Sequence, residues 1–229
     1  MLENKLIEQW KSLYLRLGGR ENEAEVVIMP LMSLYSPKHR PYHNLDHISI
    51  SIDELHKVKH LSDNPDEIEF AIWMHDAIYN PKLEDNEEKS ADLAQIIANA
   101  IGLPKEKGKR IYTLVMATKH NNYESTNDGK LIADIDMIIL GVTKSEFDKY
   151  SREIEQEYSF VDKLTYTKHR IKFVKNMLAK DRIYQTDYFR NKYEQQARQN
   201  LTEHLRELEK DIRNFNCNIF AIYGLDTVT

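Results

Sequence analysis

Residues 40–47 read Arg-Pro-Tyr-His-Asn-Leu-Asp-His, so that eight positions hold two imidazoles, a guanidinium, an amide and a carboxylate. Pro41 disfavours helix just before it, and Asn44 is a suitable N-cap, so we expect a helix to begin at about Leu45. His43 and His47 are four residues apart, and the first turn of a helix would turn both rings to the same side. Two further polar clusters follow along the chain, and we predict that the helices bring the three together.

The second cluster is His75-Asp76, at the end of an apolar segment, and the third is Asp134 with Asp136 inside the apolar run 131–140. A buried carboxylate is costly unless it is paired or bound to a cation. Taken alone, His75-Asp76 reads as a half-buried histidine and a surface aspartate at a helix end. For the aspartates of the third cluster, an ion pair with a neighbouring Lys or Arg and a metal site are about equally favoured.

Considered together, the clusters supply a histidine, then His-Asp, then Asp, each on its own predicted helix. This is a nitrogen and oxygen ligand set suited to a borderline or hard divalent metal ion. Histidine pairs four residues apart also arise by chance, and we interpret His56 and His60 as such a pair on a solvated face. His43 and His47 differ from that pair in their setting, because Arg40 adds a guanidinium that matches phosphate.

Apolar residues at helical spacing, separated by Gly, Pro and capping signals, predict an all-α protein with one domain over residues 1–229. Pro30 should kink the second helix or delay its start, and Pro65 should open the fourth. Thr143 and Glu146 form a capping box. The predicted helices span residues 2–17, 22–35, 45–60, 65–76, 86–100, 105–119, 130–140, 143–158, 162–179 and 187–215. The tail 216–229 either packs back or mediates association, and the sequence leaves both open.

Composition excludes several classes of protein. The single cysteine, Cys217, excludes an internal disulfide framework and a thiolate-rich zinc site, and it fits a reducing compartment. A net charge of −5 argues against a dedicated duplex-DNA binder. There is no signal-peptide pattern and no apolar run of about 20 residues, so we expect a cytoplasmic protein that does not enter membranes.

The order of the clusters resembles the HD-domain metal-dependent phosphohydrolase superfamily, whose pattern is H…HD…D on an all-α bundle. The resemblance covers roughly residues 25–180 and is nearest to the small bacterial predicted HD phosphohydrolases. It implies that His47, His75, Asp76 and Asp136 are metal ligands, with Asp134 in reserve for the last. The implied ion is Mg, Mn, Zn, Ni or Fe, and the sequence does not decide between one ion and two.

A finer resemblance concerns Tyr42-His43-Asn44 followed by His47, which is similar to the signature of cyclic-nucleotide phosphodiesterases in the same superfamily. It implies that His43 is the general acid and that His47 is a ligand. Those enzymes carry a further histidine where this chain has Tyr79. This departure weakens the case for a binuclear site and for cyclic-nucleotide specificity.

The resemblance implies a hydrolase acting on a phosphate ester or anhydride of a small metabolite, with nucleotides among the candidates. Arg40 and Lys119 are candidate phosphate clamps, although each alone reads more simply as a solvated cation. His120 could be an outer-shell group, a ligand of a second metal or an exposed residue. A non-catalytic HD module that binds a nucleotide or metal is the main alternative. A di-iron oxygenase is another, and homo-oligomer formation stays open.

Overall fold

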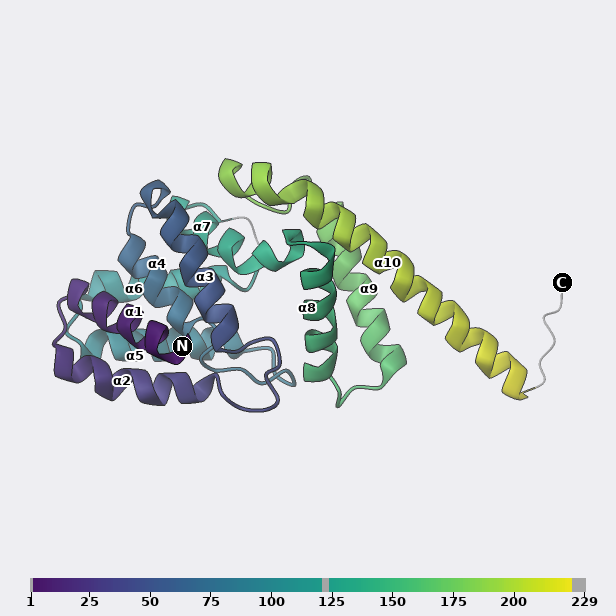
Figure 1. Ribbon diagram of the computed structural model, residues 1–229, viewed down its shortest axis with the longest axis horizontal. Coiled ribbons are helices and arrows are strands. Elements are labelled where there is room, and N and C mark those ends of the chain that lie inside the picture. Colours follow the sequence, from purple (N-terminus) through teal and green to yellow (C-terminus); the bar gives the residue numbers. More distant parts are fainter. Residues whose placement is uncertain (1, 121–123, 224–229) are drawn as a thin grey trace. The chain divides into compact units, whose positions relative to one another are not determined.

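The computed structural model describes residues 2–120 and 124–223, of which 216–223 are described by their backbone alone (Figure 1). These residues form ten α-helices and two short 3₁₀ helices, and none of them lies in a strand, which confirms the all-α prediction. The helices fall into two compact groups, residues 1–137 and 138–229, and each group is described by itself. The single-domain boundary of 1–229 stays a prediction.

The first group contains seven α-helices and one 3₁₀ helix. Their bounds are α1 Leu2–Arg16, α2 Glu21–Leu34, α3 Leu45–Val58, η1 Lys59–Leu61, α4 Pro65–Met74, α5 Asn86–Ala100, α6 Lys105–Ala117 and α7 Asn127–Asp136. The bounds predicted from the sequence agree to within three residues, apart from the end of the seventh helix. We expected that helix to run to residue 140, but α7 ends at Asp136 and the chain continues as the 3₁₀ helix η2 Met137–Gly141.

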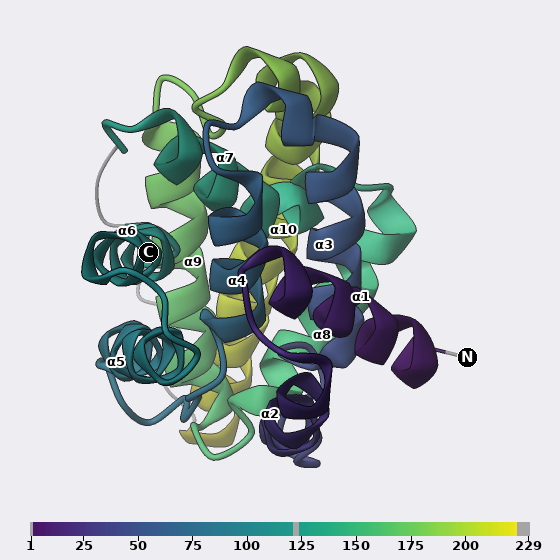
Figure 2. The same ribbon diagram turned by 90° about the vertical axis from the view of Figure 1, so that its left-hand side faces the viewer.

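Helix α4 is the centre of this group, and it packs against α1, α3, α5, α6 and α7 (Figure 2). Its residues from Ile68 onwards are buried, and Trp73 meets the ring of Trp10 edge-on, with 5.5 Å between the ring centroids. Its two buried glutamates are paired with Arg16 of α1 and Arg110 of α6, so that α4 is covered on every side. The C-terminal end of α4, which carries His75 and Asp76, is therefore fixed inside the protein.

The N-terminal ends of α4 and α7 are tied together by Asp128, a buried residue in the first turn of α7. Its carboxylate accepts hydrogen bonds from the backbone N–H of Asp63 (2.7 Å) and of Asn64 (2.9 Å), just before α4. Pro65 occupies the start of α4, as predicted. The two helices are each 10 residues long, so their C-terminal ends lie close together when their N-terminal ends do. Asp136, the last residue of α7, therefore lies beside His75, which follows α4.

The start of α3 is set by Asn44, whose side-chain oxygen accepts from the backbone N–H of Asp46 at 2.8 Å and of His47 at 3.4 Å. The predicted N-cap is therefore confirmed. Ile48 and Ile52 are fully buried on the inner face of α3. Because His47 precedes Ile48 in the first turn, the cap and the apolar face together turn its ring inward.

The second group contains α8 Lys144–Glu157, α9 Lys163–Ala179 and α10 Asp187–Tyr223. The capping box of Thr143 and Glu146 at the start of α8 is confirmed. Helix α10 extends past residue 215, where the sequence prediction ended it. Residues 224–229 of the predicted tail lie outside the described residues. Among the described helices, none combines the length and the apolarity that crossing a membrane would require.

Gly141, the last residue of η2, lies against Tyr193 of α10. A Cβ atom at Gly141 would lie 2.6 Å from the Cβ of Tyr193 and 2.7 Å from its carbonyl oxygen, so only glycine fits there. Asn200, fully buried on α10, donates to the carbonyls of Leu140 and Val142, both at 2.9 Å. This side chain supplies partners for backbone groups that the short η2 leaves unpaired.

Candidate metal centre

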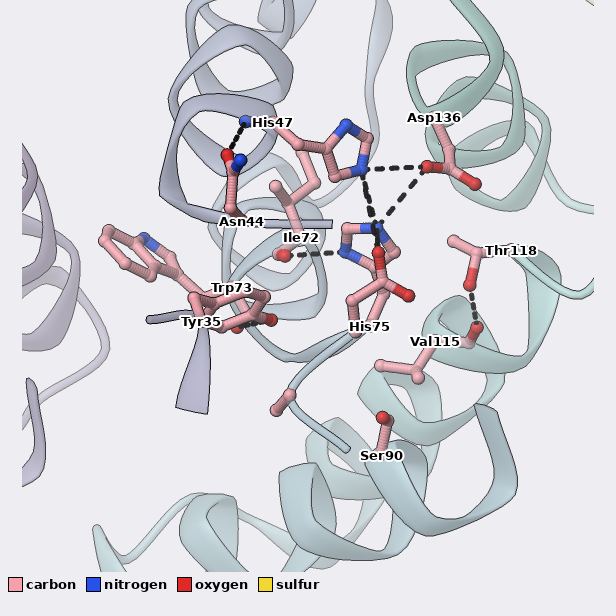
Figure 3. Close-up of polar contacts among 12 residues, drawn as sticks. Tyr35, Asn44, His47, Ile72, Trp73, His75, Ser90, Val115, Thr118 and Asp136 are labelled. Atoms are coloured by element: carbon pink, nitrogen blue, oxygen red, sulfur yellow. Dashed lines mark hydrogen bonds and ion pairs between the residues drawn. The ribbon is translucent and has the colours of Figure 1, made fainter. Parts of the chain in front are cut away.

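Three helix ends meet at one point in the first group (Figure 3). His47 lies in the first turn of α3, His75 directly follows α4, and Asp136 is the last residue of α7. The Nε2 atoms of His47 and His75 are 3.1 Å apart, and Asp136 Oδ1 lies 3.2 Å from the first and 3.4 Å from the second. His47 is 7% exposed and His75 is 3% exposed. Together these three side chains form a group that could hold a metal ion.

Asp76 adds a fourth atom, the second carboxylate oxygen, to the same point. Its Oδ2 lies 3.1 Å from His75 Nε2 and 3.8 Å from His47 Nε2. The structure thus brings together the four side chains that the sequence singled out as ligands, and their binding of an ion stays a prediction. Asp134, the reserve for the last position, is fully buried in α7 and is not a member of the group.

The hydrogen bonding of His75 tests whether these atoms suit a cation. Its Nδ1 lies 2.8 Å from the carbonyl oxygen of Ile72, which can only accept, so Nδ1 is the donor (Figure 3). In the neutral ring, Nε2 then turns a lone pair towards the carboxylates of Asp76 and Asp136. Several acceptors that face one another are stable only around a proton or a cation. Fixing the outer nitrogen of a histidine by a carbonyl is also the usual arrangement behind a metal ligand.

The spacing of the atoms agrees with this interpretation. Ligand atoms about 2.0–2.4 Å from a common ion and at right angles to one another are about 2.8–3.4 Å apart. The three distances among His47 Nε2, His75 Nε2 and Asp136 Oδ1 are 3.1, 3.2 and 3.4 Å. These atoms therefore have the geometry of one face of an octahedral site.

In the metal-free protein, a proton on His75 balances the charge of the nearby carboxylates, as a bound cation would. Burial lowers the pKa of His75, but the carboxylates of Asp76 and Asp136 outweigh it, so this pKa lies well above its ordinary value. Burial raises the pKa of Asp136, but hydrogen bonds with His120, His47 and His75 hold it well below its ordinary value. The pKa of Asp76 is lowered in the same way against its burial, chiefly by His75. A bound ion would therefore displace protons.

His120 contacts the other oxygen of Asp136, with 2.7 Å between His120 Nε2 and Asp136 Oδ2. Of the three roles left open by the sequence, this contact favours the outer-shell one. The backbone of His120 has a φ of 55°, in the left-handed region that costs a residue other than glycine about 1–2 kcal/mol. Turning the chain this way at the end of α6 directs the imidazole towards the carboxylate.

His43 lies beside the ligand group without belonging to it. Its ring is stacked near that of Tyr79, with centroids 4.3 Å apart and 30° between the planes, and it meets Tyr42 edge-on at 4.9 Å. The rings of His43 and His47 are 6.1 Å apart. His43 is half-buried, so part of the residue is open to solvent. Its role as the general acid stays a prediction that this position supports.

The two candidate phosphate clamps have protein partners already. The Nη1 and Nη2 atoms of Arg40 donate to the carbonyls of Asp76 (2.8 Å) and Ala77 (3.2 Å). Lys119 Nζ donates to the Glu88 carboxylate and, at 3.0 Å, to the carbonyl of Glu84. The pKa of Lys119 is raised, mainly by Glu88. Contact of either cation with a phosphate stays a prediction.

The sequence did not indicate two residues that hold the backbone around the site in place. Tyr35 lies under Arg40 and donates its hydroxyl to the carbonyl of Trp73 at 2.8 Å (Figure 3). Asp128 fixes the N-terminal end of α4 beside that of α7. Both act on backbone atoms that are distant in the sequence, and no local pattern signals such contacts.

Comparison of the chain with protein-family models, with curated proteins and with solved structures gave no significant match. Fold and site together define an all-α protein with a His/His/Asp group, its two histidines buried, that could bind metal.

Proposed function

We propose that this protein is a metal-dependent phosphohydrolase of the HD-domain type, acting on a phosphate ester or anhydride of a small metabolite. The observation that carries the proposal is the convergence of His47, His75, Asp76 and Asp136 from three helix ends, in the chain order typical of that superfamily. The hydrogen bond from His75 to Ile72 supports it, because it turns the ligand nitrogen inward.

Each residue of the centre would have a distinct task. A divalent ion held by the four ligands would supply a Lewis acid that lowers the pKa of a water molecule and offsets phosphate charge. With the ion bound, His75 and His47 would supply lone pairs from deprotonated nitrogens, and Asp76 and Asp136 would supply the negative charge. His120 holds Asp136 Oδ2, so that Oδ1 remains directed at the two imidazoles.

His43 would hold the proton that the leaving oxygen needs. Its ring is restrained by Tyr79 and Tyr42, which reduces the orientations open to it. It stands next to the ligand His47 rather than among the ligands, so protonation of His43 does not remove a ligand from the ion. A positioned acid of this kind contributes about 10²–10⁴-fold to a rate.

The donor set narrows the choice of ion. Two imidazole nitrogens and two carboxylates suit Mn, Fe, Ni and Zn, whereas Mg prefers oxygen ligands alone. We therefore propose one of the former as the working ion. Four protein ligands would leave about two positions of an octahedral ion for water and substrate.

The decisive experiment combines metal analysis with an activity screen. The purified protein is stripped with a chelator, reloaded with Mn, Fe, Ni, Zn or Mg separately, and assayed against nucleotides, sugar phosphates and nitrophenyl phosphates. We expect stoichiometric metal and turnover of at least one phosphate substrate, both absent from Asp76→Ala. Metal binding without turnover of any substrate would favour the non-catalytic module. Iron binding with oxygen consumption would favour the oxygenase.

A further inference from the structure

Arg40 is too deeply buried for a residue that clamps a substrate. It is 5% exposed, although it is an arginine in a loop between two helices. Its Nη1 and Nη2 atoms are directed to the carbonyls of Asp76 and Ala77. A phosphate clamp instead has to present its donors to the solvent-filled site.

The two carbonyls lie where the chain leaves α4. Helix α4 ends at Met74, so the carbonyls of Asp76 and Ala77 follow the helix and receive no N–H from its own hydrogen-bond ladder. Backbone carbonyl oxygens carry partial negative charge and need a donor when they are buried. A cation there supplies both the missing donors and the opposite charge. Asp76 is the residue whose carboxylate faces the two imidazoles, so a hydrogen bond to its carbonyl fixes the backbone from which that ligand projects.

Two tyrosine rings hold the guanidinium in this position. The Cζ atom of Arg40 lies 5.3 Å from the ring centroid of Tyr35 and 5.2 Å from that of Tyr79. Tyr35 is itself 1% exposed and is hydrogen-bonded to the carbonyl of Trp73, the residue before the end of α4. To reach a substrate, Arg40 would have to leave both rings and both carbonyls.

We infer that Arg40 is a positioning residue of the metal centre, which fixes the ligand Asp76 through its backbone, and that it does not bind the phosphate. Tyr79 also connects Arg40 with His43, because its ring lies near both the guanidinium and the imidazole. One buried cation thus supports a ligand and the proposed acid together. The inference rests on the metal centre of the proposed function, but it does not depend on hydrolysis.

The test measures metal and phosphate binding separately. Arg40→Lys keeps a cation but has no planar fork to join two carbonyls, and Arg40→Gln removes the charge. Lys38→Met is the matched control, because it removes an exposed cation two residues away. Isothermal titration of the metal-stripped proteins with Mn²⁺ gives metal affinity without substrate. Inhibition or binding by inorganic phosphate is then measured on the metal-loaded proteins, and circular dichroism reports the fold.

Both Arg40 variants should bind Mn²⁺ about 10–100-fold more weakly, as is usual when the support of a ligand is lost. Phosphate affinity at saturating metal should stay within about twofold, and Lys38→Met should match the wild type in both. In an Asp76→Asn background, which replaces the carboxylate by a weaker amide ligand, Arg40→Lys should weaken metal binding less than it does in the wild type, because the ligand on which it acts contributes less. A general structural defect would not show this dependence on Asp76.

Unchanged metal affinity with weakened phosphate binding would overturn the inference and make Arg40 the clamp that the sequence first indicated. Equal losses in the wild-type and Asp76→Asn backgrounds would also overturn it. If Arg40→Gln does not fold, Arg40→Lys carries the test, since it keeps the buried charge. Weakened metal binding in a protein that hydrolyses no phosphate would uphold the inference while refuting the proposed activity.

Discussion

Replacing Asp128 by alanine should destabilise the first group of helices by about 2–3 kcal/mol, although this residue lies at the opposite end of α4 from the metal centre. The Asp128 carboxylate accepts from the backbone N–H of Asp63 and Asn64, and from the Asn64 amide at 3.1 Å. Each backbone contact resembles a helix N-cap, which contributes about 1 kcal/mol, and the amide adds about 0.5. Asp63 is exposed, so water can partly replace the lost acceptor, and no penalty for a buried unpaired donor is added to the sum of about 2.5 kcal/mol.

Urea denaturation followed by circular dichroism measures this loss, and the thermal midpoint should fall by about 5–10 °C. Asp128→Asn keeps one acceptor oxygen and should lose about half as much, which separates the hydrogen bonds from side-chain packing. Asp128 fixes the position of α4 beside α7, and therefore that of His75 relative to Asp136. The alanine variant should consequently also bind Mn²⁺ more weakly at temperatures where it is folded. A loss below about 0.5 kcal/mol would refute the idea that Asp128 ties these two helices together.

The other predictions concern both groups of helices. His75→Ala should abolish metal binding and turnover with little loss of helix content, because the apolar core does not need an ion; an unfolded variant in circular dichroism would contradict this. His43→Gln should keep its metal and lower turnover about 10²–10⁴-fold, less for a nitrophenyl ester, whose leaving group needs no proton; loss of metal would instead make His43 a ligand. Gly141→Ala should lower the thermal midpoint, because the new Cβ meets Tyr193 at 2.6 Å; an unchanged midpoint would show that η2 can shift. Burial, aided by Arg170, lowers the pKa of His204 to about 4. The unfolded chain therefore takes up a proton first, and stability should fall as pH drops from about 6.5 to about 4; His204→Gln should flatten this dependence in denaturation measured against pH.

The helices could be predicted because their signals are local. Apolar spacing fixes the inner face of α3, and Asn44 fixes its start within the same few residues. For α7, the sequence predicts a start at residue 130, three residues later than the observed start at Asn127. In the structure, the side-chain oxygen of Thr126 accepts from the N–H of Gly129 and begins the helix at Asn127. The cap was visible in the sequence, but it stood in a stretch rich in turn residues, which favoured a loop.

The candidate ligands could be predicted for a different reason. Carboxylates such as Asp136 on an apolar helix need a partner, and this need is visible in the sequence before the partner is known. Apolarity alone does not choose between Asp134 and Asp136, since residues two apart on a helix point about 200° from each other and α7 is buried around Asp134 as well. The preference for Asp136 rests on the family resemblance. The contacts of Arg40 could not be predicted either, since backbone carbonyls have no sequence signature.

The position of the candidate ligands at helix ends leads to a last expectation about the order of binding. His75 and Asp76 follow the C-terminus of α4, and Asp136 is the C-terminal residue of α7, where helix dipoles favour positive charge. Two carboxylates add to this field. An anionic phosphate should therefore bind the metal-free protein hardly at all and should bind only after the ion. Titration of inorganic phosphate should give no heat in chelator-treated protein and a measurable affinity after Mn²⁺ is added. Equal affinity in both forms would show that phosphate is held by the protein's own cations, and Lys119 would then be the first residue to replace.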